Sequence, residues 1–321
     1  MPSIELRHLT KRYGDLVAVD RLDLAIEPGD VFGLLGPNGA GKTTTLLMLA
    51  TLVSPTSGSA TVNGFDIVKQ RARVRKSIGI VFQDPSCDDI LTGYENLKLH
   101  GMLYSMPVAL REQRIGEVLE LVDLTDRKDD LVKHYSGGMR RRLELARGLM
   151  HRPKVLLLDE PTLGLDPQSR EHIWRYIQRL AQEEKMSIVI TTHYMEEVDI
   201  LCNRLAIIDS GKIAALGTPM KLKEVIGGDV VLIVSKDADM GRLKALPFVK
   251  AGSIEGSKIS LTVDNAREHL AEILRDAGTV EAVEVHSPTL NDVFLYYTGR
   301  EIRSASPEGG WGERSMHFQS R

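Results

Sequence analysis

The chain has 321 residues, of which 42% are hydrophobic and 26% charged, and its formal net charge is −3. These values are typical of a folded protein of about two domains, and they exclude a globally basic, nucleic-acid-binding chain. Its two cysteines, Cys87 and Cys202, lie too far apart for a disulfide framework and favour a reducing compartment. No run approaches the ~18 apolar residues of a membrane span, and the first ten residues lack the apolar core of a signal peptide. We therefore expect a cytosolic chain, for which any membrane role requires a separate membrane-spanning partner.

Strand-like and helix-like segments alternate through the first two thirds of the chain. Four runs are apolar almost throughout, as in strands whose two sheet faces are both covered by helices: residues 31–35, 155–158, 188–191 and 205–208. Two stretches between them carry apolar residues at helical spacing, at positions 115, 118, 119 and 122 and at 173, 177, 180 and 181. The second stretch follows Asp166, a predicted N-cap, and Pro167, a typical first helical residue. The sequence thus predicts an α/β domain over residues 1–217, with a helical subdomain at about 87–150.

The texture of the sequence changes after Thr218 and Pro219. Three strand-like segments follow, at residues 230–234, 259–263 and 280–285, together with two helix-like segments at 266–275 and 289–297. We expect these to form a small C-terminal α+β domain over residues 218–300. Residues 301–321 are rich in Gly, Ser, Glu and Arg with little periodicity, and we expect a disordered tail.

A glycine-rich loop lies between the strand at 31–35 and a predicted helix at 43–52. It matches the phosphate-binding pattern G-x-x-x-x-G-K-[ST] in full, through Gly36, Pro37, Asn38, Gly39, Ala40, Gly41, Lys42 and Thr43, and Thr44 follows. Glycines allow backbone N–H groups to turn toward phosphates, and the helix N-terminus adds partial positive charge. We expect Lys42 to reach the β- and γ-phosphates and the Thr43 hydroxyl to bind Mg²⁺. The pattern alone indicates a nucleoside triphosphate.

Two acids, Asp159 and Glu160, end the apolar strand at 155–158. Two solvated acids after a strand are a common arrangement without function. Beside a phosphate loop, however, a carboxylate on a neighbouring strand end is needed to hold the Mg²⁺ shell, a role that fits Asp159. Glu160 is then placed to polarise the attacking water as a general base.

The segment Tyr135-Ser136-Gly137-Gly138-Met139, just before a predicted helix at 140–150, resembles the signature of the ATP-binding cassette (ABC) family. Ser136, Gly137 and Gly138 match the usual Leu-Ser-Gly-Gly-Gln, whereas Tyr135 and Met139 depart from it. A hydroxyl, exposed N–H groups and a helix N-terminus together favour phosphate. The departure at Met139 removes the polar contact that a glutamine side chain supplies in the family.

The resemblance implies roles for four further positions in residues 1–217. Tyr13 stands where the family has an adenine-stacking aromatic residue, and Gln83 where it has a glutamine that joins the two lobes and senses Mg²⁺. Residues 164–166 correspond to a loop that contacts the partner cassette. His193 stands at the position of a switch histidine that contacts the γ-phosphate and the catalytic glutamate, here Glu160. The implied catalytic set is Glu160, His193 and Lys42, and the implied Mg²⁺ set is Thr43, Gln83 and Asp159.

A weaker resemblance concerns the subtype. Residues 91–97 (LTGYENL), the signature followed by three arginines, and residues 287–294 (SPTLNDVF) are similar to the daunorubicin-resistance type of exporter ATPase. We interpret Arg140, Arg141 and Arg142 as a solvated helix face rather than a phosphate- or RNA-binding cluster, because the net charge is −3.

The family resemblance also implies how the chain works. The phosphate loop of one cassette faces the signature of another across ATP, so two copies, or one copy and a related chain, complete the sites. The helical subdomain is then expected to grip a multi-span permease subunit, which places the chain at the cytoplasmic membrane face as the motor of an exporter for a drug, lipid or similar amphiphile. The alternative is a soluble cassette ATPase in translation, repair or cluster assembly. We expect no nucleic-acid partner for the exporter.

Overall fold

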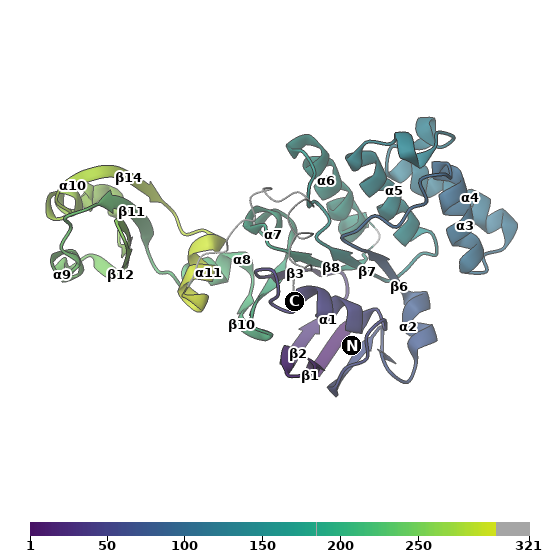
Figure 1. Ribbon diagram of the computed structural model, residues 1–321, viewed down its shortest axis with the longest axis horizontal. Coiled ribbons are helices and arrows are strands. Elements are labelled where there is room, and N and C mark those ends of the chain that lie inside the picture. Colours follow the sequence, from purple (N-terminus) through teal and green to yellow (C-terminus); the bar gives the residue numbers. More distant parts are fainter. Residues whose placement is uncertain (184, 300–321) are drawn as a thin grey trace, which may run out of the picture.

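A computed structural model describes residues 1–183 and 185–299 of the chain (Figure 1). The predicted disordered tail, residues 301–321, lies outside the described residues. At the centre stands a six-stranded sheet with strand order β10-β9-β3-β8-β7-β6. Its strands are β3 (Val31–Leu35), β6 (Ile78–Val81), β7 (Val155–Asp159), β8 (Ser187–Thr192), β9 (Arg204–Asp209) and β10 (Lys212–Gly217). The four predicted strands are therefore confirmed, each within a residue or two.

Five strands of this sheet run parallel, and β10 pairs antiparallel with β9 at one edge. Side chains alternate between two cores: Leu156 and Leu158 of β7 pack on one face, Val155 and Leu157 on the other. Because both faces are covered, each strand is apolar along its whole length. The carboxyl ends of β3, β7 and β8 meet at one edge, where α/β proteins bind their ligands.

A second, antiparallel sheet covers one face of the central sheet, with helix α1 (Lys42–Leu49) between the two layers. Its strands are β1 (Ile4–Tyr13), β2 (Leu16–Ile26), β4 (Ser57–Val62) and β5 (Phe65–Asp66), in the order β2-β1-β4-β5. The short helix α2 (Arg71–Ser77) leads back to β6. This sheet was not among the sequence-based predictions.

The helices on the opposite face include the predicted helical subdomain. It contains α3 (Gly93–Leu103), α4 (Val108–Leu121), two 3₁₀ turns at Thr125–Arg127 and Val132–His134, and α5 (Gly137–Leu149). Helices α6 (Pro167–Glu183) and α7 (Met195–Leu201) complete this layer. The backbone N–H of Ser169 donates to the carboxylate of Asp166 at 2.9 Å, which confirms the predicted N-cap. Across residues 1–183 and 185–299, we find no helix of the length and apolarity that crossing a bilayer requires.

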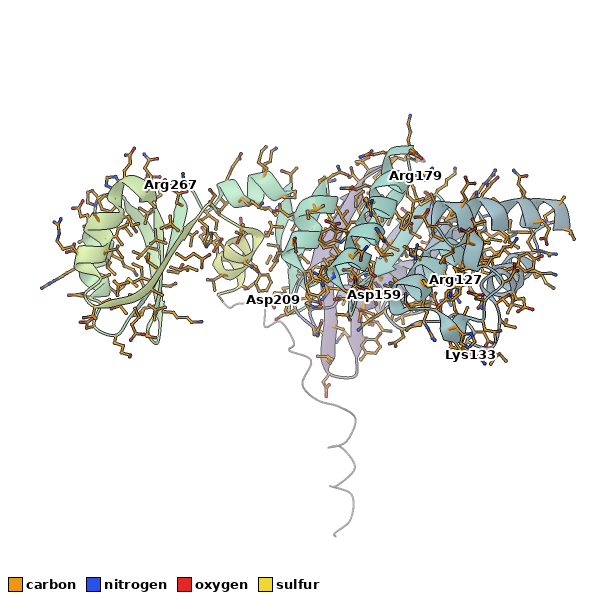
Figure 2. The ribbon with its side chains drawn as sticks, turned by 90° about the horizontal axis from the view of Figure 1, so that it is seen from above. Arg127, Lys133, Asp159, Arg179, Asp209 and Arg267 are labelled. Atoms are coloured by element: carbon orange, nitrogen blue, oxygen red, sulfur yellow. The ribbon has the colours of Figure 1, made fainter. Side chains whose placement is uncertain are left out.

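The C-terminal part forms a separate four-stranded antiparallel sheet, which both views show projecting from the rest of the molecule (Figures 1 and 2). Its order is β12-β13-β11-β14, from β11 (Asp229–Ser235), β12 (Val249–Glu255), β13 (Lys258–Val263) and β14 (Val280–His286). Helices α9 (Met240–Ala245) and α10 (Ala266–Asp276) pack on it around a core of its own. Figure 2 labels Arg267, on α10, in this projecting part.

Two helices that flank this sheet pack elsewhere. Helix α8 (Pro219–Glu224) and helix α11 (Leu290–Thr298) contact each other and β10, and α11 also contacts α7. Leu290, Val293 and Phe294 are buried in the same core as α5, α6 and α7. The helix predicted at 289–297 is thus present, but it packs on the cassette core rather than on the small sheet with which we grouped it. Its apolar residues are covered instead by the cassette core, to which Leu222 of α8 also belongs.

Candidate functional site

The glycine-rich loop joins β3 to α1 at the carboxyl edge of the central sheet. Two of its glycines, Gly39 and Gly41, have positive φ angles of 81° and 104°, which glycine adopts without strain. Close packing leaves no space for a side chain at two of the glycines. A Cβ at Gly36 would overlap the carbonyl oxygen of Ile208, and a Cβ at Gly41 would overlap the carbonyl oxygen of Ala18. The sequence therefore builds a loop with backbone pressed between β9 and β2.

Lys42 lies inside this loop and is only 4% exposed. Its Nζ donates hydrogen bonds to the carbonyl oxygens of Gly36 at 2.7 Å and Pro37 at 3.2 Å. It also lies 3.4 Å from Oε1 of Glu160. Burial lowers the pKa of Lys42, and the carboxylates of Glu160 and Asp159 oppose that shift. The ammonium is thus held at the mouth of the loop, between backbone carbonyls and an acid.

Thr43 and Asp159 meet at the edge of the sheet. The Thr43 hydroxyl donates to Oδ1 of Asp159 at 3.1 Å, and the Thr191 hydroxyl donates to the same oxygen. Asp159 is buried, and Figure 2 shows it in the middle of the cassette. The structure therefore brings together two of the predicted Mg²⁺ ligands, one from the start of α1 and one from the end of β7.

Glu160 follows directly and has a left-handed backbone, with φ of 49°. Such a conformation is costly for a residue with a side chain and persists only when its surroundings hold it. Its N–H donates to the carbonyl of Thr191 at 3.0 Å and to the Thr191 hydroxyl at 3.1 Å. The turn directs the carboxylate toward Lys42 and toward His193 at the end of β8.

Nδ1 of His193 lies 2.6 Å from Oε2 of Glu160. Both atoms are buried, and neither has an aligned hydrogen-bond partner among the described residues. The two side chains therefore lie at ion-pair distance, and both atoms can still form a hydrogen bond with a ligand. Glu160, His193 and Lys42, the predicted catalytic set, lie together in the structure.

The donor set at this edge fits Mg²⁺. Thr43 offers a hydroxyl and Asp159 a carboxylate, and magnesium takes oxygen ligands while keeping several waters and substrate phosphates. Within residues 1–183 and 185–299, no group of three or more His, Cys, Asp or Glu could hold a metal ion by itself. A site in which Thr43 and Asp159 supply two oxygens and the bound phosphates supply the others agrees with the absence of such a group from the described residues.

Three predicted positions are not joined to this cluster. Tyr13 ends β1 and is 46% exposed, with Nζ of Lys11 4.9 Å above its ring. Gln83 is exposed after β6, and its side chain makes no hydrogen bond within the part of the chain that the structure describes. Ser136 is exposed at the start of α5. Each is therefore exposed to a ligand or a partner chain.

The signature starts its helix earlier than predicted. Helix α5 begins at Gly137, not at residue 140, because the Ser136 hydroxyl caps it by accepting from the N–H of Met139 at 3.2 Å. The departure at Tyr135 also has a reason. Its ring is buried, and its hydroxyl donates to the carbonyl of Arg127 at 2.7 Å. The hydroxyl lies so close to Gly93 that a Cβ at that glycine would overlap it.

The three arginines after the signature do not form the predicted solvated face. Arg140 pairs with Asp89 at 2.6 Å, Arg142 donates to the carbonyl of Val122 at 3.0 Å, and Arg141 is buried. All three guanidinium groups hold backbone or loops in place. The signal that sequence reasoning missed is spacing: Arg141 precedes Leu145 and Gly148 by four and seven positions, on the apolar side of α5.

Comparison with known proteins gives a consistent picture. A family model described as "ABC transporter" matches residues 19–163. A daunorubicin resistance ATP-binding protein, DrrA2 of Streptomyces coeruleorubidus, is 41% identical over 94% of this chain and 97% of its own length. The chain belongs to the ABC transporter family. A second model, for the C-terminal domain of DrrA1-3-like ATP-binding proteins, matches residues 217–298 of this ABC protein.

A further relative and a solved structure are also similar to this chain. A Nod factor export ATP-binding protein I of Cupriavidus metallidurans is 41% identical, with 94% of this chain and 98% of its own covered. The dimeric ATP-binding cassette MJ0796, solved with ADP and Pi, has a TM-score of 0.61 and 26% identity, and the match covers 67% of this chain and 98% of that one. The ABC ATPase fold predicted from the sequence is thereby confirmed.

Proposed function

We propose that this chain is the ATP-hydrolysing subunit of an ABC exporter. The observation that carries the proposal is the convergence of four side chains at one edge of the sheet: Lys42 from the start of α1, Asp159 and Glu160 from the end of β7, and His193 from the end of β8. Export rests on the relatives, which are named for drug resistance and for Nod factor export. The cargo class is an amphiphile such as a drug or lipid.

The phosphate loop and its helix bind the nucleotide. The backbone N–H groups and side chains of residues 36–44 surround the phosphates, at the N-terminus of α1. Lys42 leaves its carbonyl partners for the β- and γ-phosphates, and Tyr13 stacks on the adenine. Thr43, Asp159 and Gln83 hold Mg²⁺, which neutralises charge on the phosphates when bound.

Hydrolysis proceeds by attack of water in line with the γ-phosphoryl group. Glu160 accepts the proton of that water, and its buried carboxylate is aimed by the left-handed turn of its backbone. His193, at 2.6 Å, keeps the carboxylate oriented and contacts the γ-phosphate. Lys42 stabilises the charge that develops on the phosphoryl oxygens.

The site is completed by a second cassette. Ser136, Gly137 and Gly138 start helix α5 on an exposed surface, and no hydrogen bond or ion pair within the described residues links them to the phosphate loop. We infer that they face the ATP held by a partner chain, identical or related. ATP then favours the closed dimer, and hydrolysis lets it reopen.

The permease docks on the helical subdomain. Where α3 ends and α4 begins, the subdomain carries exposed apolar side chains that its own core does not use, at Met102, Leu103 and Val108, each more than half exposed. A patch of this kind is typical of an interaction site. Through it the chain is held peripherally at the cytoplasmic face of the membrane.

Replacing the base tests the enzymatic part. Glu160→Gln keeps shape and hydrogen bonding but removes the proton acceptor, so ATP turnover should fall by roughly 10²–10⁴-fold while ATP binding persists. A stable ATP-bound dimer should appear on size-exclusion chromatography. Glu268→Gln, an exposed change on α10, is the matched control and should behave as wild type. Undiminished hydrolysis by Glu160→Gln would reject the role of Glu160.

The transport part needs the membrane. The tagged chain should co-purify from membranes with a multi-span protein, and Leu103→Glu should break that association without changing ATP binding. Recovery of the chain with ribosomes or repair complexes instead would favour a cassette ATPase without a transport role.

A further inference from the structure

The guanidinium of Arg141 donates hydrogen bonds to four backbone carbonyl oxygens on two separate loops. Its Nε donates to Pro161 at 2.7 Å, and its Nη2 donates to Asp159 at 2.9 Å and Glu160 at 3.1 Å. Its Nη1 donates to Phe82, at the end of β6. One side chain on the signature helix thus engages three consecutive carbonyls around the left-handed residue.

This arrangement is an unusual use of a charged side chain. Arg141 is 8% exposed, and its partners are neutral carbonyls rather than a carboxylate. Burial lowers the pKa of Arg141, and carboxylates nearby, first Glu144 and Glu197, oppose that effect. Arginine nonetheless stays protonated in proteins, so the donors are permanently present. A buried cation costs free energy of folding, which points to a role beyond stability.

Arg141 binds the backbone at residues 159–161, which contains the strained, left-handed residue Glu160. Glu160 has a φ of 49°, and its N–H is bound from one side by Thr191. Arg141 binds the carbonyls of residues 159–161 from the other side. The peptide that aims the Glu160 carboxylate is therefore fixed between β8 and α5.

The same helix also fixes the segment that contains Gln83. One turn after Arg141, the buried carboxylate of Glu144 accepts from the N–H groups of Ser86 and Cys87, each at 2.6 Å. With Phe82 held by Arg141, the backbone is tied to α5 on both sides of Gln83. Helix α5, capped by the signature serine, is thus a rigid anchor for Arg141.

From these contacts we propose that Arg141 is a positioning residue for ATP hydrolysis, which holds the backbone of Glu160 in the orientation that general-base catalysis requires. The proposal rests on the proposed function, since it concerns the hydrolysis step. It assigns to α5 a second task beside presenting Ser136: the helix also supports the glutamate of its own chain.

The test compares substitutions at adjacent arginines. Arg141→Met keeps the length of the side chain and removes every donor, and Arg141→Lys keeps the charge but not the fork that serves four carbonyls. Arg142→Met is the matched control, because Arg142 donates to carbonyls at residues 122 and 123, away from the site. Each is assayed for kcat, for KM and for melting temperature.

Arg141→Met should lower kcat by about 10²-fold, within the ~10²–10⁴-fold range of general-base catalysis, with KM for ATP changed less than about threefold. Arg141→Lys should show an intermediate loss, and Arg142→Met a kcat within about twofold of wild type. A purely structural role would lower melting temperature in both Met variants and leave kcat alone at 25 °C. Unchanged kcat in Arg141→Met would reject the proposal.

A double-mutant cycle supplies the decisive readout. If Arg141 acts through Glu160, adding Arg141→Met to Glu160→Gln should lower single-turnover hydrolysis by less than about twofold. Multiplication of the two losses would overturn the proposal. If Arg141→Met does not fold, Arg141→Lys enters the same cycle with the same criteria. A wild-type chain without hydrolysis, alone and with its permease, would instead reject the proposed function.

Discussion

At the scale of residues, His100 of α3 sits in a half-buried aromatic group of the helical subdomain. Its ring lies 5.0 Å from that of Tyr104 and 6.2 Å from that of His151, and Tyr104 stacks on His151 at 3.9 Å. Burial, with the positive charges of Arg147 and His151, lowers the pKa of His100 to about 3. The folded protein thus keeps this imidazole neutral in mild acid.

As a consequence, the free energy of unfolding should decrease as the pH is lowered. The unfolded chain takes up a proton at His100 below about 6.5, whereas the folded chain does not until about 3. Between pH 7.5 and pH 5.0 the free energy of unfolding should therefore drop by about 2 kcal/mol through His100 alone. Urea unfolding should show this drop in wild type and its loss in His100→Gln. His134→Gln, at an exposed position, should follow wild type, and parallel curves for all three chains would contradict the assignment.

Single residues also show what sequence can and cannot predict about the site. Lys42 and Thr43 were predicted from the phosphate-loop pattern, Asp159 and Glu160 from the apolar strand that they end beside such a loop, and His193 from the family resemblance. Arg141 was not, because it binds carbonyl oxygens, and carbonyls leave no mark in the sequence. The left-handed turn at Glu160 was equally hidden, since it is imposed by Thr191 and Arg141 rather than by a glycine.

At the scale of elements, α11 joins a core that lies far from it in sequence. Phe294 is 1% exposed and packs in the cluster shared by α5, α6 and α7. Phe294→Ala should therefore lower the free energy of unfolding of the cassette by about 3–5 kcal/mol. Tyr296→Ala, where the ring is 61% exposed, should cost less than about 0.5 kcal/mol. Calorimetry of both variants checks this, and a loss confined to the small domain would contradict the packing.

The missed elements have identifiable physical causes. Strand β1 carries a bulge at His8, where φ is 48° and the register shifts between Leu6 and Leu9, so the alternation of apolar residues is broken. Strand β12 contains Gly252 and few apolar residues, which weakens its signal. The periodicity of α11 predicted a helix correctly, but an apolar face does not say which core it joins.

At the scale of the whole molecule, complementation tests the composite site. Lys42→Ala removes a phosphate contact and Ser136→Arg blocks the signature, so each homodimer should be inactive. A mixed dimer rebuilds one of its two sites, and random mixing makes about half of the dimers mixed. Recovery should therefore reach at most roughly a quarter of wild-type ATPase activity if the sites are independent. Full activity of the Ser136→Arg homodimer would show that the signature does not face ATP.

The projecting sheet can be removed without cutting the cassette. Val230 of β11 pairs directly with His286 of β14, so the entry and exit of the sheet are neighbours about 5 Å apart. Replacing residues 229–286 by a short Gly-Ser linker should leave α8 and α11 in place, with ATP binding retained. Titration of ATP into the purified shortened chain checks this. An insoluble product would show that the sheet supports the cassette core.

The placement of α11 also orders events during synthesis. Leu290, Val293 and Phe294 cover core residues of the cassette, yet they emerge from the ribosome after the entire projecting sheet. Synthesis proceeds at ~5–20 residues per second, so this part of the cassette core stays uncovered for several seconds. During that time the projecting sheet, which is made after the rest of the cassette but before α11, can already fold. Helix α11, the last helix of the described residues, thus completes the core of the cassette, and a premature stop before α11 would release a cassette with an open core.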